Sequence, residues 1–407
     1  MRILAGLDVG SHTINAVAGY MTEEGRLELV GHGSVASRGI RAGAVVHLEA
    51  ASDAMETVLH QVENDCGFPL EQIAMGLGDD SVRSFNGRGV VPVMGKDREV
   101  SAADKQKAFQ AAQAMGIPSD REVIHMIQQE YILDGQSGIR EPEGMWGERL
   151  EAQAHIVTGL VSVVRNFQKA LGRIHYKADR IILAPLAIAR AVLHPDEEHW
   201  GVAVIDLGAQ TTGITIIHED TLKDTAILGV GCDRITHDLA VGLRTPLAEA
   251  EMVKCRWGLA SGSSTGRDEP EITAMGGNGS RNVAPSLLTS IVGPRVEEIL
   301  GLVVRKIQYT MPLSRLQGGL VLTGGGANLI GLSQHAQRIL QVPVRIGHPT
   351  GLGNLPPEGL NPSWSCAVGL LMEMAAEGNP EEQSGKKQLI NKVTRPIKEF
   401  VKARLAL

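Results

Sequence analysis

The sequence predicts an α/β protein made of two related halves, with a small α+β insert and a C-terminal amphipathic helix. Three observations predict this organisation. An apolar stretch that ends in Asp-x-Gly and continues into a second apolar stretch occurs at residues 3–17 and again at 202–217. A segment of different pattern, residues 84–158, lies between the two copies. Residues 386–407 are basic and carry apolar side chains at helical spacing.

The first copy opens a half made of strands followed by a helix. Apolar patterns predict strands at 3–7, 13–21, 27–34 and 73–77 and a helix at 48–62. The turn after Asp8 passes through Gly10, so that a carboxylate and a row of backbone N–H groups meet at one point. Such a point suits a metal-bound phosphate.

The segment 84–158 predicts a compact α+β insert, too short to be another copy of the half. Ser101 and Asp104 have the spacing of a capping box and open a helix that runs to Met115 and stops at Gly116. Strands are expected at 90–93, 123–127, 131–133 and 152–157. Two helices, 161–171 and 186–193, around a strand at 180–183 lead back to the first half.

The second copy repeats the order of the first. Strands are expected at 202–206, 212–218, 222–228 and 320–322, and helices from about 233, at 287–307 with a bend at Gly293-Pro294, and from about 329. The Gly- and Ser-rich segment 258–283 predicts an exposed loop and hairpin. Thr323-Gly324-Gly325-Gly326 forms a strand–glycine turn–helix, which favours close approach of a nucleotide.

Composition restricts the class of protein. With 407 residues, 43% of them hydrophobic and 21% charged, the chain is typical of globular proteins of several domains. A formal charge of −7 argues against nucleic acid as the main partner. The four cysteines are far apart and predict reduced thiols. No apolar run approaches the roughly 20 residues of a membrane span, and we expect no cleaved leader before the first strand.

The C-terminal end reverses the acidic balance of the chain. After a polar linker, 377–385, the segment 386–407 has one acid, Glu399, among many Lys and Arg residues. Its apolar face is expected to comprise Ile390, Val393, Ile397, Phe400, Val401 and Leu405. The helix could pack on its own domain, but a basic amphipathic helix behind a linker favours an anionic membrane, where each basic residue adds roughly 1 kcal/mol.

The three glycine turns, in this order and spacing, resemble the two phosphate loops and the adenosine loop of the actin-like ATPase superfamily. Within it, the insert resembles that of the bacterial cell-division protein FtsA. The motifs that carry this resemblance are Asn86–Val91, Ser101–Ala112, Asp120–His125, Gln129–Gln136 and Gly138–Met145. The resemblance covers nearly the whole chain and implies an actin-like, ribonuclease H-like fold.

The resemblance also implies a division into subdomains. These are a first half-repeat at 1–83 with a return at 159–200, the insert at 84–158, a second half at 201–228 and 308–376, an FtsZ-binding subdomain at 229–307, the linker at 377–385 and the membrane helix at 386–407.

The cofactors implied are ATP and Mg²⁺. The implied nucleotide contacts are Asp8, Gly10 and Ser11; Asp206, Gly208, Thr211 and Thr212; Glu251 and Lys254 at the base or ribose; and Gly324, Gly325 and Gly326. Asp8 and Asp206 would hold Mg²⁺ mainly through water. Thr13 stands where the family usually has lysine, and Ala209, Gln210 and Gly213 also depart from its pattern. We therefore expect nucleotide binding with at most weak ATPase activity.

The implied partners follow from the same resemblance. The FtsZ C-terminal peptide would bind at Arg295 and Glu298, with Arg281 a weaker candidate. Further copies would join in a head-to-tail polymer, and later division proteins would bind the insert. The cytoplasmic face of the inner membrane at the division site would be contacted through Ile397, Phe400, Val401 and Leu405. By spacing alone, Arg295 and Glu298 also fit a surface ion pair. The alternatives are a PilM-like pilus assembly protein and a small-molecule kinase with the same cleft. No catalytic base or sugar pocket for a kinase is evident in the sequence.

Overall fold

The computed structural model describes residues 2–113, 116–258, 260, 269–273, 279–356 and 360–377. The proposed membrane residues Ile397, Phe400, Val401 and Leu405 lie outside the described residues. The described chain forms two compact units, a larger one from residues up to Ser84, 118–122 and Thr158 onward, and a smaller one from 85–117 and 123–157. Each unit is described by itself.

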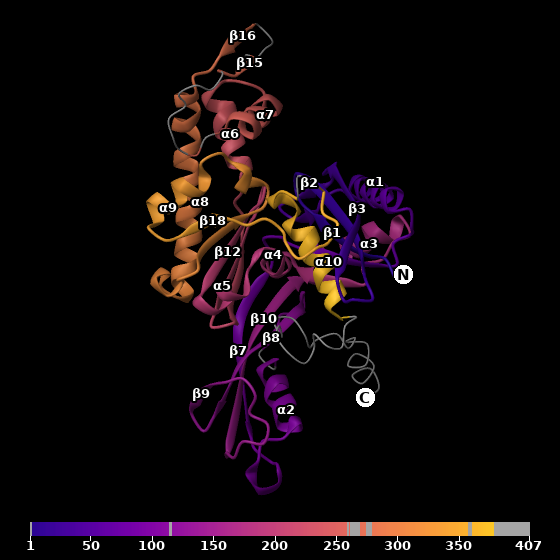
Figure 1. Ribbon diagram of the computed structural model, residues 1–407, viewed down its shortest axis with the longest axis vertical. Helices are drawn as coiled ribbons and strands as arrows, with labels where there is room; N and C mark the ends of the chain where they lie inside the picture. Colours follow the sequence, from indigo (N-terminus) through magenta and orange to yellow (C-terminus); the bar gives the residue numbers. More distant parts are fainter. Residues whose placement is uncertain are drawn as a thin grey trace. The chain divides into compact units, whose positions relative to one another are not determined.

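The larger unit contains two five-stranded sheets, both visible in Figure 1. The first has the order β11-β6-β1-β2-β3 and is built from β1 (Leu4–Val9), β2 (Thr13–Met21), β3 (Leu27–Ala36), β6 (Gln72–Leu77) and β11 (Arg180–Leu183). The second has the order β18-β17-β12-β13-β14 and is built from β12 (Val202–Leu207), β13 (Thr212–His218), β14 (Thr221–Leu228), β17 (Gly319–Thr323) and β18 (Val344–Ile346).

The two sheets have the same pairing, which confirms the predicted duplication. In each, the first strand pairs antiparallel with the second and parallel with the fourth. Even the register matches, because Asp8 lies opposite Asn15 and Asp206 lies opposite Gly213, the same distance along each hairpin. The repeat therefore places Asp8 and Asp206 at equivalent points.

Helices cover both sheets. They are α1 (Leu48–Cys66), α3 (Val161–Arg173), α4 (Ala184–Val192), α5 (Pro195–Trp200), α6 (Asp233–Gly242), α7 (Leu247–Trp257), α8 (Pro285–Thr310), α9 (Leu332–Leu340) and α10 (Ser365–Glu377). Helices α5, α7 and α10 were not predicted from the sequence. The helix expected from about 329 begins at Leu332, because Gly325–Asn328 forms a 3-10 turn first. Helix α8 continues through Pro294, and a short hairpin, β15 (Glu271–Thr273) and β16 (Ser280–Asn282), precedes it.

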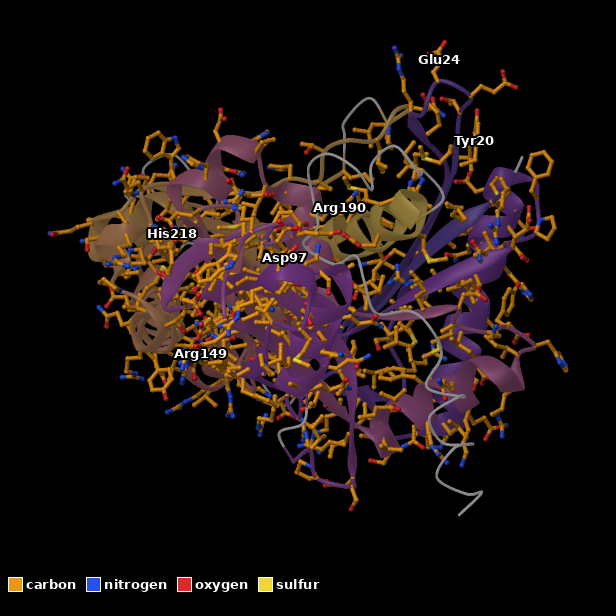
Figure 2. All side chains as sticks on the ribbon, turned by 90° about the horizontal axis from the view of Figure 1, so that it is seen from below. Tyr20, Glu24, Asp97, Arg149, Arg190 and His218 are labelled. Carbon is orange, nitrogen blue, oxygen red and sulfur yellow. The ribbon has the colours of Figure 1, made fainter. Side chains whose placement is uncertain are left out.

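Helices α4 and α10 cross at very short range. A Cβ atom on Gly369 of α10 would lie 1.8 Å from the carbonyl oxygen of Ala187, and one on Gly6 of β1 would lie 2.1 Å from that of Ala367. Beyond the crossing, Arg190 of α4 pairs with the buried Glu373 of α10 at 3.3 Å, and Figure 2 shows Arg190 beside the yellow ribbon of α10. Helix α10 thereby joins the first sheet to α4.

The smaller unit is an α+β body, as predicted. Its sheet has the order β7-β10-β8-β9, from β7 (Arg83–Pro92), β8 (Arg121–Leu133), β9 (Gln136–Ile139) and β10 (Arg149–Leu160), with α2 (Ala102–Gln113). The capping box is confirmed, since the N–H of Asp104 donates to Ser101 Oγ at 3.2 Å and that of Ser101 donates to Asp104 Oδ2 at 3.1 Å. The two strands expected at 123–127 and 131–133 are one strand, β8. The polar residues 128–130 between them are partly buried and continue the strand.

Candidate functional site

A cavity of about 490 Å³ lies in the larger unit, between the turns of the two Asp-x-Gly hairpins. The residues expected at a nucleotide that line it are Asp8, Gly10, Ser11, Asp206, Gly208, Thr211, Glu251, Lys254, Gly324, Gly325 and Gly326. Thr212 is not among the lining residues. Its side chain is fully buried, and its hydroxyl donates to the Val230 carbonyl at 2.7 Å.

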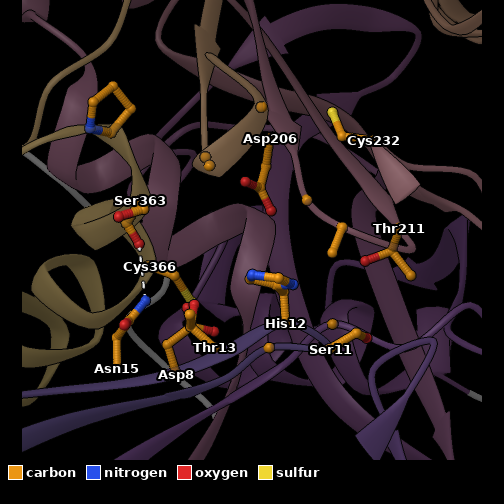
Figure 3. A pocket seen from close by; sticks show the side chains of 18 of the residues that line it. Asp8, Ser11, His12, Thr13, Asn15, Asp206, Thr211, Cys232, Ser363 and Cys366 are labelled. Carbon is orange, nitrogen blue, oxygen red and sulfur yellow. Dashed lines mark hydrogen bonds between the residues drawn. The ribbon is translucent and has the colours of Figure 1, made fainter. Parts of the chain in front are cut away.

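Asp8 and Asp206 project into this cavity from opposite hairpins (Figure 3). Burial raises the pKa of Asp8 to about 6, opposed by hydrogen bonds from Cys366 and Asn15. Burial and, as a smaller contribution, the charge of Asp8 together raise the pKa of Asp206 to about 7. The hydrogen bond from Cys366 accounts for more of the lower pKa of Asp8, and the register for part of it, because Asp206 faces Gly213, which has no side chain to donate. A bound cation would lower both pKa values and so favour the state in which both carboxylates are ionised.

The ligand-free protein should therefore lose stability as pH rises from about 4 to 7, because the folded state holds protons on Asp8 and Asp206 that the unfolded state has released. Asp206→Asn removes one buried charge and should raise the free energy of unfolding at about pH 7.5 and flatten this dependence. Urea unfolding between about pH 5 and 8 measures both effects. Asp53→Asn, at an exposed site on α1, is the control; a wild-type pH profile that rises over this interval would contradict the prediction.

The glycine turn after β17 lies directly on the second hairpin. Gly324 has a φ of 80°, and a Cβ atom there would be 2.2 Å from Asp206 Oδ1. A Cβ atom on Gly326 would be 2.3 Å from Cys232 Sγ. Bare backbone therefore faces the cavity beside Asp206, as close approach of a ligand requires.

Helix α7 supplies the charged wall of the cavity. Lys254, which is 8% exposed, donates to Glu251 at 2.7 Å and to Thr236 Oγ1 at 2.9 Å. Burial alone would raise the pKa of Glu251, but the bonds from Lys254 and Thr236 hold it below its usual value. His12 of the first hairpin faces the same carboxylate at 3.9 Å. His12 was not predicted as a cavity residue, although its position next to Ser11 in the first turn could have indicated it.

Three thiols also line the cavity, and the sequence analysis assigned none of them to it. Cys366, at the start of α10, bonds Asp8, and burial raises its pKa well above the usual value. Burial raises the pKa of Cys232 to about 12 and also raises that of Cys255. All four cysteines are free, as expected. No sequence signal connects Cys366 with Asp8, because the contact comes from the packing of α10 on β1.

The residues expected at an FtsZ peptide lie away from the cavity. Arg295 of α8 donates to Asp238 of α6 at 2.6 Å, and it also pairs with Glu298, three residues further along α8. Arg281 of β16 donates to the Leu243 carbonyl at 2.6 Å. Arg295 thus bonds helix α6 and Arg281 the residue just after it, and Asp238 was not singled out from the sequence.

The residues present fit a cation-bound nucleotide. Two carboxylates facing one cavity favour a bound cation, and the glycine turns let a phosphate approach the backbone closely. In the described parts of the chain, no three His, Cys, Asp or Glu side chains are grouped to hold a metal directly. Two acids and water are the ligands that Mg²⁺ usually retains.

Two sheets of one strand order, with equivalent Asp-x-Gly hairpins facing one cavity, define the actin-like class of proteins. Solved structures agree on the fold. The PilM-PilN type IV pilus biogenesis complex is similar with a TM-score of 0.66 and 16% identity, over 91% of this chain and 98% of that one. MreB5 of Spiroplasma citri bound to ADP has a TM-score of 0.57 and 13% identity, over 95% and 99%.

The sequence comparisons give the family. Residues 203–369 match the model for cell division protein FtsA, and residues 80–158 match the SHS2 domain inserted in FTSA. The cell division protein FtsA of Neisseria meningitidis serogroup B is 37% identical over 94% of this chain and 93% of its own length. That of Escherichia coli K12 is 31% identical over 98% and 96%. The chain belongs to the FtsA family of cell division proteins.

Among the described helices, none is long and apolar enough to cross a bilayer.

Proposed function

We propose that this chain binds ATP with Mg²⁺ in the cavity between its two hairpins. The pair of carboxylates at Asp8 and Asp206, set against the bare glycine turn, is the observation that carries this proposal. The ion would neutralise the phosphates and the two acids, which are costly to ionise together. Glu251 and Lys254 lie on the wall where α7 can contact the base or ribose. MreB5 structures with ADP and AMPPNP support a nucleotide in this fold.

Hydrolysis of this nucleotide should be slow or negligible. Thr13 supplies no cation at the first turn, and Gly213 supplies no acid opposite Asp206 to order water. The side chains beside Asp206 thus offer little for activating an attacking water. Phosphate release from purified protein with lipid, far above a blank and abolished by Asp206→Ala, would contradict this part of the proposal.

We further propose a scaffold role in division at the cytoplasmic face of the inner membrane. In this role, the chain polymerises head to tail, binds the FtsZ C-terminal peptide, contacts later division proteins through the insert, and attaches to anionic lipid through 386–407. Family membership and the basic, amphipathic composition of the tail support it.

Purified protein with ATP should bring FtsZ to anionic liposomes in co-sedimentation, and deletion of 386–407 should abolish this recruitment. Loss of the basic residues and of the apolar face removes both contributions to membrane affinity. A variant that keeps the tail but replaces its apolar residues Ile397 and Phe400 by Ser leaves the charge unchanged and so separates insertion from charge attraction. Recruitment that persists without the tail would remove the anchor from the proposal.

Arg295→Glu should abolish binding of the FtsZ C-terminal peptide. Reversal of the charge places three acids together, since Asp238 and Glu298 already flank Arg295. Fluorescence anisotropy with a labelled peptide measures the affinity, and a melting curve shows whether the fold is kept. Arg305→Glu, on the same helix α8, is the matched control. Retained affinity in a folded Arg295→Glu protein would refute the assignment.

A further inference from the structure

A short hairpin of the first half reaches the cavity from the side. It consists of β4 (Ile40–Arg41) and β5 (Ala44–Val45), between β3 and α1. Its turn residues Ala42 and Gly43 both have left-handed backbones, with φ of 48° and 74°. The turn is pressed against the chain after β6, where a Cβ atom on Gly43 would lie 2.6 Å from the Gly78 carbonyl. Its position in the first half is therefore fixed.

The two N–H groups of this turn are held by side chains of the two Asp-x-Gly hairpins. The N–H of Gly43 donates to Ser11 Oγ at 3.0 Å, within the first half. The N–H of Ala42 donates to Gln210 Oε1 at 2.7 Å, and Gln210 belongs to the second half. Ser11, Gly43 and Gln210 all line the cavity. The Ala42–Gln210 bond thus crosses from one half to the other at the cavity edge.

The other end of Gln210 is anchored in its own half. Its Nε2 donates to Asp233 Oδ2 at 3.0 Å, at the start of α6. The backbone N–H of Asp233 in turn donates to the Ala209 carbonyl at 2.8 Å, which ties α6 to the hairpin turn. Both ends of one carboxamide are therefore occupied, one in each half. A glycine at position 210 could make neither bond.

We propose that Gln210 is a positioning residue that latches the two halves across the phosphate end of the cavity and sets the rate of nucleotide exchange. The inference rests on the proposed nucleotide binding at this site. The latch exists without a ligand, and in this proposal it opens both when nucleotide enters and when it leaves. Its removal should speed association and dissociation together. Loss of a direct ligand contact would speed dissociation alone.

Stopped-flow fluorescence with a methylanthraniloyl-labelled ATP and Mg²⁺, on the full chain, separates these cases. For Gln210→Ala we expect both rate constants to rise about tenfold, with Kd changed by less than about threefold, as two lost hydrogen bonds allow. Gln210→Glu keeps the acceptor for Ala42 but repels Asp233, and should give intermediate rates. Gln337→Ala, exposed on α9, is the control. Faster dissociation alone, or unchanged rates, overturns the proposal.

Amide exchange in the nucleotide-free protein tests the latch independently of any ligand. Exchange at Ala42 should be about tenfold faster in Gln210→Ala, whereas Gly43, held by Ser11, should change less. Unchanged exchange at Ala42 overturns the latch. If wild-type protein binds no labelled ATP, the proposed function fails, while the exchange measurement still decides whether Gln210 joins the halves.

Discussion

Gly369→Ala should destabilise the protein by more than about 4 kcal/mol, a loss that few single substitutions cause. The added Cβ atom would lie 1.8 Å from the Ala187 carbonyl oxygen and 2.3 Å from its carbon, both backbone atoms of α4. Helix α10 can relieve this contact only by moving off α4, and it also packs on β1, where Gly6 allows an equally close approach. The clash therefore spreads to the first sheet.

Urea unfolding of purified protein, or its recovery in the insoluble fraction, measures this loss. Gly301→Ala is a matched control, because Gly301 also lies inside a helix, α8, and an added Cβ atom there meets nothing within 4 Å. This change should stabilise the protein by up to about 1 kcal/mol, since alanine is the better helix former. The two Gly→Ala substitutions should therefore change the free energy of unfolding in opposite directions. A Gly369→Ala protein as stable as wild type would show that α4 and α10 are not closely packed where they cross.

Gly324→Ala should reduce ATP affinity at least about 100-fold while the protein still folds. The new methyl group would lie 2.2 Å from Asp206 Oδ1 and 3.0 Å from two backbone atoms of Leu207, so the Asp206 carboxylate would have to move. The side chain of Asp206 can turn where the backbone at Ala187 cannot, so the cost falls on the site more than on the fold. Isothermal titration with ATP and Mg²⁺ measures the affinity.

The left-handed backbone of Gly324 needs its own control. Gly67, which caps α1, has a φ of 74°, close to the 80° of Gly324, but an added Cβ atom there has no neighbour within 4 Å. Gly67→Ala should cost about 1 kcal/mol of stability through backbone strain and leave ATP affinity unchanged. Equal losses of affinity in both variants would mean that strain, and not Asp206, explains the effect.

Much of this fold was predictable because its signals are local. Each Asp-x-Gly hairpin is a short pattern, so its repetition predicted two sheets of one order, and the Ser101–Asp104 box marked a helix start. Helix α10 was not predicted because its apolar composition fits a buried strand as well as a buried helix. The strand β8 was predicted as two strands because the polar residues 128–130 interrupt its apolar pattern, although they are extended within one strand in the structure.

The site was predictable to the same extent. Residues on the hairpin turns were found because Asp and Gly must stand at fixed offsets there. Thr211 and Thr212 could not both face the cavity, since neighbouring residues of an extended chain point to opposite sides, and sequence alone does not say which one does. Cys366 and the partners of Gln210 come from distant segments that only packing brings to the hairpins.

The positions of the cysteines allow the opening of the cavity to be followed by thiol modification. Cys232, Cys255 and Cys366 line it, while Cys66 ends α1 in another part of the larger unit. Under a maleimide, the exposed Cys255 should be modified first, and the buried pair only during opening of the cleft. The rates at which these cysteines are alkylated, with Cys66 as an internal reference, would therefore report how fast the cavity opens. No residue would have to be substituted for this measurement.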